Sequence, residues 1–189
     1  MEKRLKKHTF ALFLLFAVAA GVHARISSAQ ANQKILGWFK GPVSVSAGGT
    51  LSLFNSDEQN NQLFGFGAYA DLDFKRRIGF EAIARWLPIN GISGETQSNY
   101  LIGPRIQVRR VWKAHPYIKI LGGVSRSTFN HGVAAGDFGT VAAGGGIDIP
   151  WKHNLTIRAI DYEYQFWPIY LGDPLTPHGF SSGISYRFR

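Results

Sequence analysis

The sequence predicts an all-β protein, an eight-stranded antiparallel up-and-down transmembrane β-barrel. Three observations point to this fold class. The chain begins with a basic and then apolar segment, its remaining length alternates apolar with small or polar residues, and turn-forming residues separate the alternating stretches. In Leu63–Phe74 (LFGFGAYADLDF) every second residue is apolar. Because successive side chains of a strand point to opposite faces, this strand has one apolar face. Such strands, repeated behind an export signal, are typical of membrane barrels.

The N-terminal segment has the composition of a secretory signal peptide. Residues 1–8 are rich in Lys and Arg, and Phe10–Val22 is apolar and uncharged. A basic region followed by a short apolar region is typical of export signals, whereas a membrane-spanning helix needs about 20 apolar residues. Small residues permit cleavage after Ala24 or after Ala29. We expect a signal peptide at 1–24, a periplasmic tail at 25–41 and an outer-membrane β-barrel at 42–189.

The composition excludes several classes of protein. The chain of 189 residues has no Cys, which argues against a disulfide-stapled exported domain and against lipoprotein processing. Its net charge of +9 includes the basic leader, and the remaining Lys and Arg are scattered rather than clustered on one face. We therefore expect no nucleic-acid partner.

The first four strands are expected at Val43–Phe54, Leu63–Phe74, Ile78–Leu87 and Ser98–Arg110. The first strand is rich in Ser and Gly and alternates least clearly. The next three carry apolar residues on one face and charged, polar or small residues on the other. In the fourth strand Pro104 lacks an N–H for the ladder, so we expect a local irregularity there.

The last four strands are expected at Pro116–Ser127, Phe138–Ile149, Leu155–Phe166 and His178–Phe188. In the seventh strand the alternation breaks, because apolar residues of its first half would share a face with acidic residues of its second half. One extra residue in a strand shifts the alternation by one position. We therefore expect a β-bulge near Ala159–Ile160.

The connections between these strands alternate in expected length. The turns at Lys75–Arg77, Val111–His115 and Pro150–His153 are short. The other four connections are longer: Asn55–Gln62, Pro88–Gln97, Thr128–Asp137 and Trp167–Pro177. Short periplasmic turns and longer outer loops are usual in outer-membrane barrels, so the sequence predicts four extracellular loops.

Charged residues recur on the polar faces of the strands and would all enter one lumen. The interior of an eight-stranded barrel is just filled by side chains, and buried charges need partners. We therefore predict an ion-pair network in the lumen, with a narrow water or ion path as the alternative. The predicted members are Asp71, Asp73, Glu81, Arg85, Arg105, Arg109, Lys119, Asp148, Arg158, Asp161, Glu163 and Arg187.

Aromatic residues gather near the predicted strand ends. In membrane barrels such residues form girdles at the depth of the lipid headgroups. The alternatives are the aromatic core of a soluble β-sandwich and a soluble ligand-binding barrel whose apolar face points inward. The predicted membrane-interface aromatics are Trp38, Trp86, Trp112, Trp151, Trp167, Tyr186 and Phe188.

The sequence offers little catalytic chemistry. His178 and Ser181 lie close together with Asp173 upstream, but residues three apart point to opposite faces of a regular strand. The remaining candidates, His115, His131 and His153, are expected in turns or loops, in contact with solvent. We predict no catalytic residue, no metal site and no cofactor. A lipid A-modifying barrel enzyme, of deacylase type, is the alternative.

Two segments resemble the small outer-membrane β-barrel proteins of the OmpA-like and OmpX-like type, the opacity-protein class. Gly144–Tyr164 (GGGIDIPWKHNLTIRAIDYEY) is similar to their turn and strand near the end of the barrel, and His178–Arg189 (HGFSSGISYRFR) is similar to their closing strand. The family usually ends on an aromatic residue that the barrel-assembly machinery reads, whereas here Arg189 follows Phe188. The resemblance implies that this machinery is a partner.

Together, these features predict a non-enzymatic, monomeric protein in the outer membrane of a Gram-negative-type bacterium, with a structural or surface-interaction role. Its expected surroundings are outer-membrane lipid and lipopolysaccharide.

Overall fold

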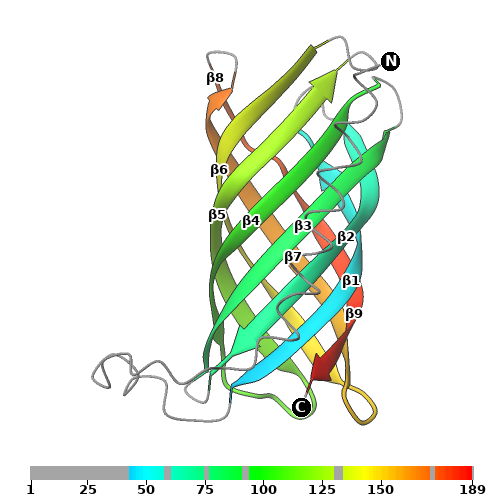
Figure 1. Cartoon of the computed structure of the whole chain (residues 1–189), viewed down its shortest axis with the longest axis vertical. Helices are drawn as coiled ribbons and strands as arrows, with labels where there is room; N and C mark the ends of the chain where they lie inside the picture. Colours follow the sequence, from blue (N-terminus) through cyan, green and yellow to red (C-terminus); the bar gives the residue numbers. More distant parts are fainter. Residues whose placement is uncertain are drawn as a thin grey trace, which may run out of the picture. The chain divides into compact units, whose positions relative to one another are not determined.

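The described part of the chain is a closed antiparallel β-barrel. The computed structural model describes residues 43–57, 61–74, 77–90, 94–129, 134–170 and 173–188. The strands are β1 Ser44–Asn55, β2 Gln62–Asp73, β3 Ile78–Asn90, β4 Thr96–Gln107, β5 His115–Phe129, β6 Ala134–Pro150, β7 Leu155–Tyr170, β8 Asp173–Leu175 and β9 His178–Phe188. The long strands pair in the order β6-β5-β4-β3-β2-β1-β9-β7, and β7 returns to β6 (Figure 1). The short β8 pairs with β7 alone. The predicted eight-stranded fold class is confirmed.

Several predictions concern residues outside this part of the chain. The expected signal peptide at 1–24, both cleavage positions, the expected tail at 25–41 and Trp38 all lie there. Among the described residues, no helix is long and apolar enough to cross a membrane.

As predicted, the outer face of the barrel wall is apolar and the inner face carries the polar and charged side chains. Along β2 the buried residues Leu63, Tyr69 and Asp71 alternate with the exposed residues Phe64 and Phe66. In a closed barrel the buried face lines the lumen, so the carboxylate points inward and the phenyl rings point outward. An outer surface of exposed apolar side chains suits lipid. The alternatives of a soluble barrel with an apolar interior and of a β-sandwich are therefore wrong.

The predicted bulge in β7 is present. Ile147 of β6 pairs with Ile160, whereas the next residue, Asp148, pairs with Arg158. Ala159 is therefore the extra residue, and the β7–β9 register shifts at the same place. As a consequence Arg158 and Asp161 are both buried on the inner face, although they are three positions apart.

The β4–β5 ladder is interrupted at Pro104, where an irregularity was expected. Ile102 pairs with Gly122 and Arg105 pairs with Lys119, with no pair between them. The register is the same on both sides of the interruption. The missing N–H of proline accounts for the gap without a change of alternation.

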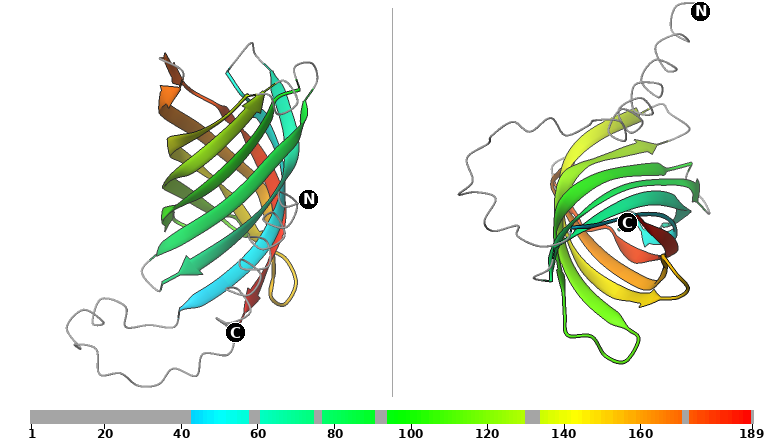
Figure 2. Two further views of the ribbon diagram at one scale, coloured as in Figure 1. Left: turned by 45° about the horizontal axis from the view of Figure 1, so that its top comes forward. Right: turned by 60° about the horizontal axis from the view of Figure 1, so that its bottom comes forward.

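The connections at the end of the barrel away from the C-terminus are shorter than predicted. β3 continues to Asn90, β5 to Phe129 and β7 to Tyr170, so that residues 91–95, 130–133 and 171–172 are what remains before the next strand in each case. The strands are tilted across the barrel wall, and they extend into segments that the sequence predicts as loops (Figure 2). These strand extensions contain polar residues, and the alternation that predicts a strand is not evident in them. Backbone pairing with a neighbouring strand does not depend on side-chain polarity.

The contrast between the barrel's faces leads to a first prediction. Ile102 lies on the outer face within β4 and is 62% exposed, and Val108 lies on the chain directly after β4. Ile102→Arg should lower the free energy of unfolding by about 2–4 kcal/mol, because Arg near the bilayer midplane is costly, whereas Val108→Arg near the interface should cost about 0–1 kcal/mol. Urea titration of the barrel in phospholipid vesicles measures both. Equal costs for the two variants would contradict a lipid-facing outer surface.

Candidate functional site in the barrel lumen

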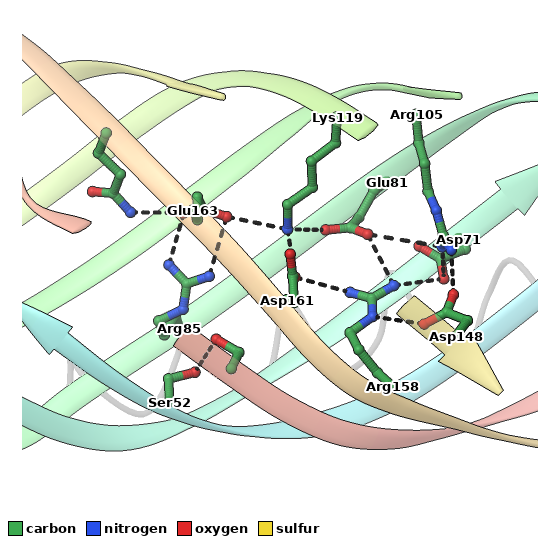
Figure 3. A network of polar contacts seen from close by, with 12 residues as sticks. Ser52, Asp71, Glu81, Arg85, Arg105, Lys119, Asp148, Arg158, Asp161 and Glu163 are labelled. Atoms are coloured by element: carbon green, nitrogen blue, oxygen red, sulfur yellow. Dashed lines mark hydrogen bonds and ion pairs between the residues drawn. The ribbon is translucent and has the colours of Figure 1, made fainter. Parts of the chain in front are cut away.

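The barrel interior holds a cluster of nine charged side chains, which we call the lumen network. Strands β2 to β7 all contribute, with three members from β7 and two from β3 (Figure 3). The lumen network consists of Asp71, Glu81, Arg85, Arg105, Lys119, Asp148, Arg158, Asp161 and Glu163. All nine are buried. Each therefore depends on its neighbours for charge compensation.

The lumen network ends on one side in a two-point contact between Arg85 and Glu163. Arg85 donates from Nη1 to Oε1 of Glu163 at 3.0 Å and from Nη2 to Oε2 at 3.3 Å. The Arg85 guanidinium also lies 4.2 Å from the ring centroid of Phe54. Gln165 donates to Glu163 Oε1 at 2.8 Å. This geometry satisfies the planar guanidinium and carboxylate together.

Lys119 occupies the middle of the lumen network. Its Nζ lies 2.8 Å from Glu81 Oε1, 2.6 Å from Asp161 Oδ2 and 3.2 Å from Glu163 Oε2. An ammonium group has three hydrogens to donate, and here three carboxylates surround it. The side chain is fully buried, so its charge depends on these partners.

Two arginines stacked on tyrosine rings complete the lumen network. Arg158 Nη2 lies 3.1 Å from Asp71 and 3.0 Å from Glu81, and its Nε lies 3.3 Å from Asp148. Arg105 pairs with Asp71 and Asp148. Each guanidinium also lies 3.8 Å from the centroid of a tyrosine ring: Arg158 over Tyr69 and Arg105 over Tyr117. Stacking on an aromatic face adds a favourable interaction to the ion pairs.

Three residues predicted for the ion-pair network lie outside it. Arg109 is exposed, because β4 ends at Gln107 and the inward alternation ends with it. Asp73 is half-buried and Arg187 is exposed. These two lie at strand ends, where they line a cavity at the mouth of the barrel together with Asp71 and Arg105.

The other end of the lumen is filled mainly by neutral side chains, with Glu95 as a buried carboxylate among them, and the charge-based prediction left all of these out. Phe54, Leu63 and Leu87 form one buried cluster there. Asn99 donates to Ser125 Oγ at 2.8 Å. Strict alternation would have identified most of these inward positions, because Leu63, Leu87 and Asn99 are an even number of residues from the charged, inward-facing residues of their strands.

Among the described residues, the predicted interface aromatics lie either in turns or on the outer face of strands, with the exception of Trp167. Trp112 and Trp151 are 84% and 59% exposed, in the turns after β4 and β6. Trp86, on the outer face of β3, donates to the Tyr100 hydroxyl at 3.0 Å. Tyr186 and Phe188 of β9 are exposed and in edge contact with one another. Their positions at membrane depth stay a prediction.

Trp167 is not an interface residue. It is 1% exposed, stacks on Phe138 with 5.6 Å between ring centroids and packs against Leu175. β7 runs on to Tyr170, so the alternation set by the bulge continues through Gln165 to Trp167 and turns the indole inward. The sequence pattern instead predicts a loop that begins at this residue.

The candidate catalytic residues do not meet. His178 is half-buried and stacks on Tyr164 of the outer face, whereas Ser181 points into the lumen and bonds Ser52 Oγ at 2.8 Å. Asp173 is exposed in β8. In the part of the chain that the structure describes, no group of three or more His, Cys, Asp or Glu is arranged to hold a metal ion.

The remaining histidines are spread over the chain. His115 is half-buried at the start of β5, and His153 is exposed in the turn after β6. His131 lies outside the described residues.

Known structures share this architecture, although sequence comparison gives no relative. No family model matches the sequence, and no curated protein does. Neisserial surface protein A (NspA) superimposes with a TM-score of 0.56 at 11% identity, covering 77% of this chain and 97% of that one. The N-terminal β-barrel domain of Pseudomonas aeruginosa OprF gives 0.54 at 9% identity with the same coverage. Ail of Yersinia pestis gives 0.49 at 16% identity, again with that coverage. The fold implied by the resemblance to the OmpA-like and OmpX-like class is confirmed.

The lumen network leads to a second prediction, with a surface pair as its control. Glu163→Gln leaves Arg85 and Lys119 short of a carboxylate in a buried site, so the free energy of unfolding should fall by about 3–5 kcal/mol. Asp137→Asn removes the same kind of partner from Arg126 on the exposed surface, where little change is expected. Denaturant unfolding in detergent compares the two. A similar small effect of both would show that the lumen pairs add no net stability.

Proposed function

We propose that this protein is a non-enzymatic outer-membrane β-barrel of a Gram-negative-type bacterium. Its role is structural, or it presents its hairpin ends to other surfaces, and the segment at 1–24 directs its export. The observation that carries the proposal is the lumen network: its carboxylates and cations pair with one another inside a barrel whose outer face is apolar. Side chains that compensate each other in this way are committed to holding the barrel together.

The hairpin ends away from the C-terminus are the proposed extracellular surface. Among the described residues of this end, side chains link neighbouring hairpins. Asp57, after β1, accepts a hydrogen bond from the Thr176 backbone N–H at 3.1 Å, and Asn61 donates to Glu95 at 3.1 Å. These hydrogen bonds hold neighbouring hairpins together at the proposed extracellular surface. Loops held by a rigid scaffold are frequent interaction sites.

The proposed partners are those of an outer-membrane resident. Outer-membrane lipid and lipopolysaccharide surround a monomeric barrel. The assembly machinery engages the closing strand β9, whose last outward residues are Tyr186 and Phe188.

The decisive experiment is fractionation of cells that express the full chain. We expect the protein in the outer-membrane fraction, with a gel mobility that changes on heating because the closed barrel resists detergent. Mass spectrometry of lipid A from cells with and without the gene tests the enzymatic alternative. A periplasmic protein without heat-dependent mobility would overturn the proposal, and altered lipid A acylation would replace it by an enzyme.

A filled lumen makes a further prediction about conductance. The purified barrel should give no channel events in planar bilayer recordings, because the lumen network and the apolar cluster of Phe54, Leu63 and Leu87 occupy the interior. Reproducible steps of current would favour the narrow-pore alternative. An authentic porin recorded in the same bilayers is the control for detection.

A further inference from the structure

The end of the barrel that carries the C-terminus has a rim of exposed cations. Three turns form this end, and they join β2 to β3, β4 to β5 and β6 to β7 (Figure 2). We call their exposed cations the basic rim: Arg77, Arg109, Arg110, Lys113 and Lys152. The described acidic residues nearest to this end are Asp73, which is half-buried, and Asp148, which is buried in the lumen network. The exposed surface here therefore carries a net positive charge.

The basic rim lies next to the last lipid-facing residues. Val108 is 47% exposed and directly precedes Arg109, and the exposed Trp151 directly precedes Lys152. Trp112 lies in the turn between Arg110 and Lys113, with the Lys113 ammonium 5.4 Å from its ring centroid. Exposed indole rings beside exposed cations are the residues that favour the headgroup layer of a membrane.

Backbone hydrogen bonds fix the turns that carry the basic rim. Val111 and Ala114 exchange two backbone hydrogen bonds, of 3.0 and 2.9 Å. Leu155 donates from its backbone N–H to the Lys152 carbonyl at 2.9 Å, and Gln107 donates to the Arg77 carbonyl at 2.8 Å. The backbone positions that carry the cations are thus held close to the barrel wall.

The opposite end of the barrel has a different charge. Its described cation, Arg126, is bound to Asp137 through two hydrogen bonds, of 2.7 and 2.9 Å. The other described charges at that end are the acidic side chains of Asp57, Glu95 and Asp173. An anionic partner is therefore favoured at the C-terminal end and disfavoured at the other.

We propose that the basic rim binds the phosphate groups of anionic glycerophospholipids at the membrane surface into which this end opens. The inference rests on the proposed function, because it requires a barrel in a bilayer. Glycerophospholipid phosphates lie at the depth where the apolar wall ends, and Lys and Arg near an anionic surface each contribute about fivefold in affinity. In a barrel whose short turns face the periplasm, these are the lipids of the periplasmic leaflet.

The test uses the folded full chain in a neutral detergent, titrated with phosphatidylglycerol or with phosphatidylcholine, and counts bound lipids by native mass spectrometry. The wild type should bind phosphatidylglycerol on the order of tenfold more tightly than phosphatidylcholine. The variant R77Q/R110Q/K113Q/K152Q should lose this preference. Arg126→Gln, at the opposite end, is the matched control and should keep it. Heat-dependent gel mobility verifies that each variant is folded.

Three results would overturn the inference. These are equal binding of the two lipids by the wild type, an unchanged preference in the folded quadruple variant, and loss of preference in the Arg126→Gln control. If the quadruple variant does not fold, K113Q/K152Q replaces it, and its preference should fall several-fold. A parallel titration with lipid A distinguishes binding of its phosphates from binding of glycerophospholipid phosphates, which lie in the other leaflet. Because the titration is done in detergent, its failure is distinguishable from a failure of outer-membrane localisation.

Discussion

Charge compensation inside the lumen is the constraint on which the rest of this structure depends. Removing an ion from water carries a penalty of several kcal/mol unless a partner of opposite charge replaces the lost hydration. Lys119 of β5 meets this condition through Glu81 of β3 and Asp161 and Glu163 of β7. None of these three strands pairs with another of the three. The lumen network therefore connects opposite walls of the barrel, which the ladder of backbone hydrogen bonds joins only between neighbours.

The lumen network requires the bulge at Ala159. Without an extra residue, Arg158 and Asp161 would point to opposite faces, and one of the two charges would meet lipid. The bulge brings both inward, where Arg158 stacks on Tyr69 and pairs with carboxylates of three other strands, β2, β3 and β6. A local departure from regular strand geometry is thus a condition for the long-range pairing. Bulges in barrels commonly redirect side chains in this way.

Much of the fold could be predicted from the sequence, because a barrel strand shows the polarity of its two surroundings at every second residue. The broken alternation even indicated the bulge, since Asp161 could not share a face with lipid-exposed side chains. The predictions were wrong where the alternation of side chains does not indicate the end of a strand. Trp167 faces inward because β7 continues beyond its apolar stretch, and Arg109 is exposed because β4 ends before it. Which charges pair was also beyond the sequence, because the partners of Lys119 are set by strands far apart along the chain.

The two ends of the lumen give the buried charges unequal access to solvent. At one end Trp167 and the cluster with Phe54 close the interior, while at the other a cavity opens beside Asp148 and Arg187. The lumen network contains five carboxylates against four cations. Asp148 has the most exposed side chain of the nine, at 12%. Asp148 lines this cavity together with the exposed Arg187, so the member of the lumen network that water reaches most easily lies at the open mouth, beside a further cation.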